Sequence, residues 1–122
     1  MTVLGVAGAG ALGAVARYLV DRTIQQRSYR VFPMGTFIVN ISGSFLAGVI
    51  LGLVLYHGMA KTPATVLGVG FLGAYTTLST FTFESVRLIE SGTVLLGVAN
   101  IALSVGAGLV AAGAGLAVGG LA

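Results

Sequence analysis

Four uncharged stretches, separated by short segments that carry all of the charged residues, organise this chain. They have 16, 30, 22 and 32 residues and are Met1–Ala16, Val31–Ala60, Thr62–Phe83 and Ser91–Ala122. A helix needs about 20 apolar residues to cross the hydrocarbon core of a bilayer. Three stretches are long enough, and the first becomes so when Arg17 reaches to the interface. The pattern predicts helices over 2–20, 34–56, 64–90 (interrupted) and 92–118, with Pro33 and Pro63 at tolerated helix starts.

Composition supports a membrane protein and excludes several soluble classes. Only 7% of residues are charged and 57% are hydrophobic, whereas a soluble domain has roughly a quarter of its residues charged. This excludes an ordinary soluble enzyme, a disordered tail and a nucleic-acid-binding domain, and the net charge of +3 forms no basic patch. The chain has no cysteine, which excludes disulfides and thiolate sites. We expect an all-α membrane protein with four transmembrane helices in a single domain, 1–122, in the cell membrane.

The first stretch also has one feature of a cleaved signal peptide. Ala14-Val15-Ala16 has the small-x-small pattern of a cleavage site. However, no Lys or Arg precedes the apolar run, whereas Arg17 and Arg22 follow it. That order favours a retained helix whose N-terminus lies outside the cell.

Two stripes of small and polar residues recur at spacing four on the second and fourth predicted helices. They are Asn40, Ser44, Gly48 and Gly52, and Asn100, Ser104, Gly108 and Ala112. Small residues at this spacing favour close helix packing. An asparagine at membrane depth brings donors and an acceptor that all need partners. For Asn40 we favour a pore role over packing, and for Asn100 both interpretations stand.

The third stretch is unusually rich in hydroxyl groups, with six in the eight residues 75 to 82. Ser and Thr side chains compete with the helical hydrogen bonds of the backbone, and Gly73 weakens the helix further. We therefore predict a third helix broken near the membrane midplane, with a kinked but inert helix as the alternative. Irregular backbone at that depth must be buried in protein or line a wet cavity, as it does in channels and transporters.

The polar lining indicates which ion it suits. No uncharged stretch holds an Asp, Glu, Lys or Arg, whereas proton-coupled pumps and cation exporters place a carboxylate inside the membrane. Hydroxyl and amide donors replace water around a small anion, and the ring edges of Phe81 or Phe83 carry partial positive charge. This chemistry predicts passive conduction of a small anion that accepts hydrogen bonds.

Four stretches resemble the CrcB/Fluc fluoride channel family. They are Gly10-Ala-Leu-Gly13-Ala-Val-Ala-Arg17-Tyr18, Gly35-Thr-Phe-Ile-Val-Asn40-Ile-Ser-Gly43-Ser-Phe, Gly70-Phe-Leu-Gly73-Ala-Tyr-Thr76-Thr77-Leu78-Ser79-Thr80-Phe81 and Ser104-Val-Gly-Ala-Gly108-Leu. One such motif alone is weak, but four in order at this chain length are specific. The resemblance implies an antiparallel dimer of four-helix subunits with two pores, which exports fluoride that has entered the cell as the neutral acid.

The resemblance also implies residue roles. Asn40 would donate to fluoride, Phe81 would offer a ring edge, and Ser79, Thr80 and Ser104 would line the path. The carbonyls of Gly73 and Thr76 would hold a structural Na⁺ at the dimer centre. Arg17 would raise the local anion concentration near a vestibule, or would serve as an interfacial anchor.

Two positions depart from the family pattern. Leu78 stands where the family usually has a phenylalanine, and Asn100 where it commonly has a tyrosine. The basic residues also fall five to one on opposite sides, with Lys61 alone on the minor side and the loops near 21–32 and 84–91 inside. Such a bias disfavours two orientations of one sequence. The partner is therefore either a second copy, as an antiparallel homodimer, or an oppositely oriented paralogue that supplies the missing aromatic ring.

Three other functions are less well supported. A small multidrug transporter needs a membrane-embedded carboxylate, and a non-conducting or partner-dependent subunit stays open because of Leu78. An enzyme is not expected, because His57 lies at a helix end without a partner base or nucleophile nearby in the sequence. Glu84 and Glu90 flank Arg87 at spacing three, which is typical of an interfacial ion-pair face.

Overall fold

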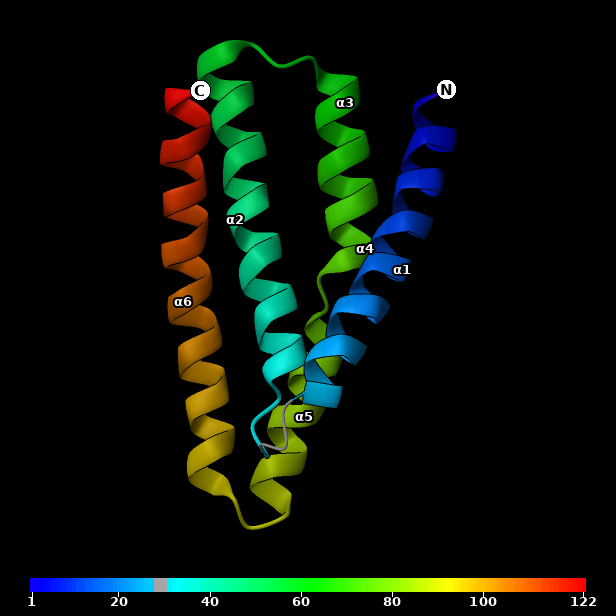
Figure 1. Ribbon diagram of the computed structural model, residues 1–122. Coiled ribbons are helices and arrows are strands. Elements are labelled where there is room, and N and C mark those ends of the chain that lie inside the picture. The colour runs from blue at the N-terminus through cyan, green and yellow to red at the C-terminus, as the bar shows by residue number, and fades with distance from the viewer. Residues whose placement is uncertain (28–30) are drawn as a thin grey trace.

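The computed structural model describes residues 1–27 and 31–122, which are helical apart from short connections. The elements in order are α1 (Thr2–Arg27), α2 (Met34–His57), α3 (Lys61–Thr65), the π-helix η1 (Val66–Leu72), α4 (Gly73–Tyr75), α5 (Leu78–Glu90) and α6 (Val94–Leu121) (Figure 1). Within these ranges, four helical stretches are long and apolar enough to cross a membrane: α1, α2, α3 through α5, and α6. The chain is therefore a multi-pass membrane protein, as its sequence predicts.

Helix α1 is seven residues longer than predicted, since it ends at Arg27 and not at residue 20. Polar contacts between successive turns continue the helix beyond the apolar run. The guanidinium of Arg22 donates to the Tyr18 hydroxyl at 2.9 Å, and its carbon lies 5.9 Å from the Tyr18 ring centroid. The hydroxyl of Thr23 donates to a carbonyl one turn earlier at 2.7 Å. The prediction ended where the hydrocarbon-spanning length ended, whereas the helix continues into the polar region.

The other predicted boundaries also shift. The third stretch begins at Lys61, three residues early, because Pro63 is tolerated within a first helical turn. The last helix begins at Val94 and not at 92, because Gly92 takes a left-handed conformation (φ 92°) in the turn after α5. The π-helix η1 has no counterpart in the sequence prediction. Such segments are rare and are frequent at functional sites.

The stripes of α2 and α6 pack against each other. A Cβ atom at Gly48 would overlap the carbonyl of Ala112, and one at Gly108 would lie 3.6 Å from the Ser44 hydroxyl oxygen. Glycine therefore allows the two backbones to approach closely, which is the packing arrangement predicted for these positions. Helices α2 and α6 run side by side along most of their length (Figure 1).

Helix α1 crosses the third stretch in the same close manner. A Cβ atom at Gly13 would overlap the Phe71 carbonyl at the end of η1. The small buried core lies beside this crossing and consists of Val39, Leu72 and Tyr75. The Tyr75 hydroxyl is 2.9 Å from the Ser42 hydroxyl of α2, so its polar end has a partner. The core therefore holds α1, α2 and the third stretch together where the latter changes direction.

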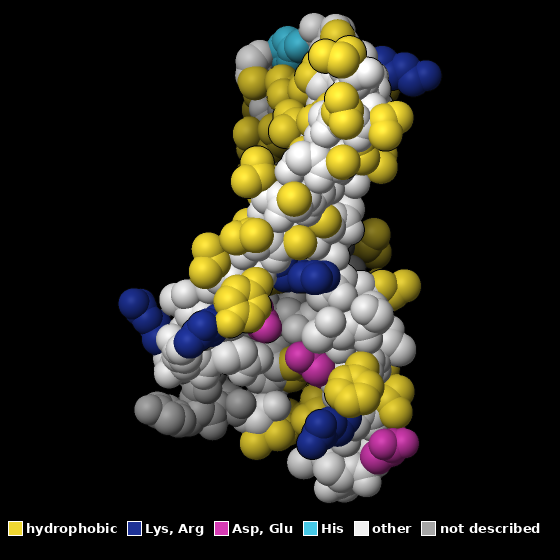
Figure 2. All heavy atoms as spheres, turned by 90° about the vertical axis from the view of Figure 1, so that its right-hand side faces the viewer, with side chains coloured by type: hydrophobic (Ala, Val, Ile, Leu, Met, Phe, Trp, Pro, Cys, Tyr) yellow, Lys and Arg dark blue, Asp and Glu magenta, His cyan; other side chains and the backbone are white. Residues whose placement is uncertain are grey.

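The two ends of the subunit differ in charge. Both termini lie at one end, with the α2–α3 connection, and the α5–α6 turn lies at the other (Figure 1). Figure 2 shows most charged side chains gathered over the lower half of one face, below a largely hydrophobic upper half. Arg22, Arg27 and Arg87 lie in the last turns of α1 or α5 at the lower end, whereas Lys61 begins α3 at the upper end. Arg30, which the predicted topology also counts, lies outside the described residues.

Candidate functional site

The third membrane stretch is interrupted at Thr76 and Thr77, midway between Lys61 and Glu90. Both residues are extended, with ψ of 158° and 121°. Their hydroxyls bond to nearby backbone, as the sequence predicts for this segment: Thr76 donates to the Leu72 carbonyl at 2.9 Å, and Thr77 accepts from the N–H of Thr80 at 3.2 Å. Thr77 is thereby the N-cap of α5. The predicted break is confirmed and lies at these two residues.

Asn40 of α2 binds the backbone of the break with both ends of its side-chain amide. Its nitrogen donates to the Thr77 carbonyl at 2.9 Å, and its oxygen accepts from the Thr77 N–H at 2.8 Å. An amide nitrogen carries two hydrogens, so one remains for a further acceptor. Asn40 therefore supports the break and keeps one donor of the kind predicted for it.

Several backbone carbonyls before the break lose their usual helical donors, among them those of Gly73 and Thr76. In a continuous helix the N–H of Thr77 would donate to Gly73, and the N–H of Thr80 would donate to Thr76. Here those N–H groups bond instead to Asn40 Oδ1 and to Thr77 Oγ1. The carbonyls of Gly73 and Thr76 are thus left for other partners, and carbonyls of unwound helices coordinate Na⁺ in transporters. The residues at the predicted sodium site fit the ion in donor type.

A cavity of about 170 Å³ leads from the charged half of the subunit to the break. Its polar and charged lining comes from α1, α2, α5 and the break: Arg17, Tyr18, Asp21, Thr36, Thr77 and Thr80. Arg17 is half-buried, ten residues before the end of α1, and so lies within the subunit and not at a helix end. Arg17 lines the cavity, and its roles as a vestibule residue and as an interfacial anchor both stay predictions.

Comparison with known proteins identifies the family. A family model described as "CrcB-like protein, Camphor Resistance (CrcB)" matches residues 4–116. The chain belongs to the CrcB family. A relative from Symbiobacterium thermophilum, named "Fluoride-specific ion channel FluC 1", is 49% identical over 119 residues, covering 96% of this chain and 94% of the relative. One of the same name from Leifsonia xyli subsp. xyli is 44% identical, covering 100% of this chain and 89% of the relative. "Fluoride-specific ion channel FluC 2" from Mycobacterium tuberculosis is 46% identical, covering 89% and 83%.

The start of α5 carries four of the residues that the CrcB resemblance singles out. Thr80 and Phe81 are half-buried, whereas Ser79 is exposed and Leu78 is 76% exposed. The hydroxyls of Ser79 and Thr80 lie 3.4 and 3.1 Å from Thr77 Oγ1. The hydroxyls are therefore collected at the break, while Leu78 points away from the subunit.

Ser104 lies on α6 and reaches the others only through a chain of hydrogen bonds. Its hydroxyl donates to Asn100 at 3.3 Å, Asn100 donates to Ser85 at 2.8 Å, and Ser85 donates to the Phe81 carbonyl at 2.8 Å. Asn100 is 1% exposed and Ser85 is 2% exposed. Asn100 thus has the burial and the interhelical bond expected of a packing residue, and its pore role stays a prediction. Sequence reasoning missed Ser85, because a serine within an amphipathic helix gives no sign of its partner on another helix.

The surroundings of Glu84 differ from the interfacial ion-pair face that its spacing to Arg87 indicated. It is half-buried on α5, and its Oε1 accepts a hydrogen bond from the Thr36 hydroxyl at 3.1 Å. Its other oxygen, Oε2, and Oδ1 of Asp21 are buried without a hydrogen-bond partner among the described residues. The negative charges of Asp21 and Glu84 repel each other. Glu84 lies seven residues after Thr77, about two helical turns toward the charged end, so carboxylates occur below the break although the uncharged stretch itself holds none.

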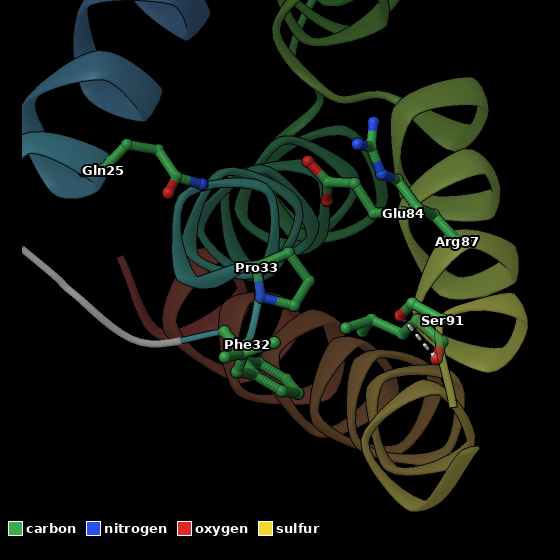
Figure 3. A pocket seen from close by; sticks show the side chains of 8 residues that line it. Gln25, Phe32, Pro33, Glu84, Arg87 and Ser91 are labelled. Carbon is green, nitrogen blue, oxygen red and sulfur yellow. Dashed lines mark hydrogen bonds between the residues drawn. The ribbon is translucent and has the colours of Figure 1, made fainter. Parts of the chain in front are cut away.

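A second cavity, of about 280 Å³, lies beside Glu84 at the charged end. Figure 3 shows Gln25 from α1, Pro33 at the start of α2, and Glu84 and Arg87 from α5 around it. The Ser91 hydroxyl donates to the Leu88 carbonyl at 3.2 Å at its lower edge. The polar region therefore continues from the break toward the charged end, between α1, α2 and α5.

His57 has a neighbour that its sequence context did not reveal. Its Nε2 lies 3.1 Å from the Gly120 carbonyl, near the end of α6. This contact joins the ends of α2 and α6 at the surface opposite the charged end.

Proposed function

We propose that this chain is a subunit of a fluoride-selective passive channel that exports fluoride across the cell membrane. The observation that carries the proposal is the cavity that begins beside Arg17 and ends at the Thr77 and Thr80 hydroxyls. Arg17 attracts an anion, and the Thr80 hydroxyl offers a donor to it at a depth where the stretch from residue 62 to 83 has no Lys or Arg to trap it. Relatives named fluoride-specific ion channels support the choice of ion.

The polar surface at the break supports a dimer. Gly73 and Ser79 are exposed in the single subunit, and irregular backbone with polar side chains is not stable against lipid. A second copy covers this surface in an antiparallel homodimer, or an oppositely oriented paralogue covers it in a heterodimer. The outward position of Leu78 favours the heterodimer, because an aromatic ring from the partner then stands where this chain has none. Without that partner, the chain alone is a non-conducting subunit.

A structural Na⁺ at the dimer centre completes the proposal. The freed carbonyls of Gly73 and Thr76 supply hard oxygen ligands. Two carbonyls leave the coordination shell of a cation incomplete, so the site takes the same two groups from the second subunit. The ion neutralises the partial negative charge of the two helix ends that meet there.

Fluoride efflux from liposomes tests the proposal. Purified protein is reconstituted into vesicles loaded with potassium fluoride, and external fluoride is followed with an electrode after addition of a potassium ionophore. Efflux by the single chain supports a homodimer, and efflux only after co-expression with an oppositely oriented paralogue supports the heterodimer. Absence of fluoride efflux in both cases contradicts the proposed function.

A further inference from the structure

Thr77 takes part in hydrogen bonds through its N–H, its carbonyl and its hydroxyl. Its N–H and carbonyl bond to Asn40, at 2.8 and 2.9 Å. Its hydroxyl oxygen accepts from the Thr80 N–H at 3.2 Å and donates to the Thr80 hydroxyl at 3.1 Å. The residue is 9% exposed and extended (φ −145°, ψ 121°). Thr77 thus joins α2, the break and the first turn of α5.

We propose that Thr77 is the positioning residue of the break, which opens the cation-binding carbonyls and orients a donor of the anion path at the same time. The first half of this role follows from two diverted N–H groups. The N–H of Thr77 is held by Asn40, and so does not close on Gly73. The N–H of Thr80 is held by the Thr77 hydroxyl, and so does not close on Thr76. Both carbonyls assigned to sodium are therefore released through Thr77, one through its backbone and one through its side chain.

The second half follows from the direction of one hydroxyl bond. The Thr77 hydroxyl accepts the Thr80 N–H, so its own hydrogen is free to be donated to Thr80 Oγ1. Thr80 Oγ1 then accepts a hydrogen bond from Thr77, and its own hydroxyl hydrogen remains available for another acceptor. Thr77 and Thr80 both line the 170 Å³ cavity. Thr77 consequently leaves the Thr80 O–H available as a donor at the edge of this cavity.

This inference rests on the sodium site of the proposed function, and it predicts a specific loss. Thr77→Val keeps the shape and the backbone N–H but removes the hydroxyl. The Thr80 N–H then loses its partner, so the first turn of α5 no longer fixes the backbone next to the Thr76 carbonyl, which weakens the cation site. Thr77→Ser retains the hydroxyl and the site. The matched control is Thr82→Val, because the Thr82 hydroxyl is exposed on α5 and donates only to the Leu78 carbonyl of its own helix.

The test measures the melting temperature of purified protein in detergent micelles against sodium concentration, with potassium or N-methylglucamine as the replacement cation. Sodium is expected to raise the melting temperature of the wild type, of Thr77→Ser and of Thr82→Val alike. For Thr77→Val the apparent sodium affinity is expected to fall about tenfold, as for the loss of one hydrogen bond. A purely structural role of Thr77 would lower the melting temperature equally at all sodium concentrations.

Two results overturn the inference: an unchanged sodium response in Thr77→Val, or a wild type whose melting temperature does not depend on sodium. If Thr77→Val cannot be purified, Thr77→Ser and Thr77→Ala repeat the comparison, because that pair also differs only by the hydroxyl. Fluoride efflux of the same wild-type preparation separates the two proposals. Suppose that Thr77→Val loses the sodium response and that the wild type does not conduct fluoride. That pair of results refutes the proposed function and leaves the role of Thr77 intact.

Discussion

Replacement of Asn40 by leucine is the perturbation whose cost the structure defines best. The change removes two hydrogen bonds to Thr77, of 2.9 and 2.8 Å, and leaves a nearly buried backbone N–H without a partner. An unsatisfied buried polar group costs about 1–3 kcal/mol. Loss of the bond to the Thr77 carbonyl costs less, because this N-cap carbonyl also accepts the first hydrogen bond within α5. Interhelical hydrogen bonds in membrane proteins average about 0.6 kcal/mol, so we expect Asn40→Leu to cost about 2 kcal/mol.

The assay is reversible unfolding in mixed micelles with an increasing fraction of sodium dodecyl sulfate, followed by far-ultraviolet circular dichroism. The control is Ser44→Ala, one turn along the same face of α2, where the hydroxyl donates only to the Asn40 carbonyl of its own helix at 2.8 Å. We expect that control to change the free energy of unfolding by less than about 0.5 kcal/mol. Equal costs for Asn40→Leu and Ser44→Ala, or no cost for Asn40→Leu, would refute the role of Asn40 in holding the break.

Three further changes test other parts of the structure. Gly48→Val places side-chain atoms where the α6 backbone lies, so it is expected to destabilise the fold by at least about 2 kcal/mol in the same micelles. Its control, Gly106→Ala, has open space around the added Cβ and is expected to be neutral. Asp21→Asn removes one of two like charges on carboxylates that have unpartnered buried oxygens, so we expect about 1 kcal/mol of stabilisation at neutral pH; destabilisation would contradict repulsion between Asp21 and Glu84. Arg17→Gln is expected to slow fluoride efflux roughly tenfold at low ionic strength, with the difference from wild type shrinking in high salt; a salt-independent loss would show that Arg17 acts otherwise than by attracting the anion.

The sequence was sufficient to predict the number of membrane helices, because length and apolarity alone determine which segments cross a bilayer. It also located the break within a few residues, since the hydroxyls of Thr76 and Thr77 bond to backbone within four residues along the chain. Close packing at Gly48 and at Ala112 followed from spacing four on each helix, whereas the structure shows that these two positions face each other. Each of these features depends on local chemistry or on helical periodicity.

Contacts between distant segments were not predictable in this way. Asn40 and Thr77 are 37 positions apart, and nothing local in either segment indicates that one amide bonds both backbone groups of the other. The half-buried Glu84 bonds to Thr36, 48 positions away, whereas its spacing to Arg87 indicated an interfacial ion-pair face. Helix α1 packs closely against the π-helix before the break. The sequence shows neither this contact nor the π-helix, because single-residue preferences do not distinguish π- from α-helix.

The anion selectivity of the reconstituted protein tests the central claim most directly, namely that amide and hydroxyl groups at a helix break substitute for the water around a small halide. Planar bilayers with fluoride on one side and chloride on the other give a zero-current voltage for the purified chain, alone or with its partner. We predict a voltage set by the fluoride gradient and insensitive to chloride. A voltage set by chloride or by the cation, in a membrane that does carry current, would contradict it.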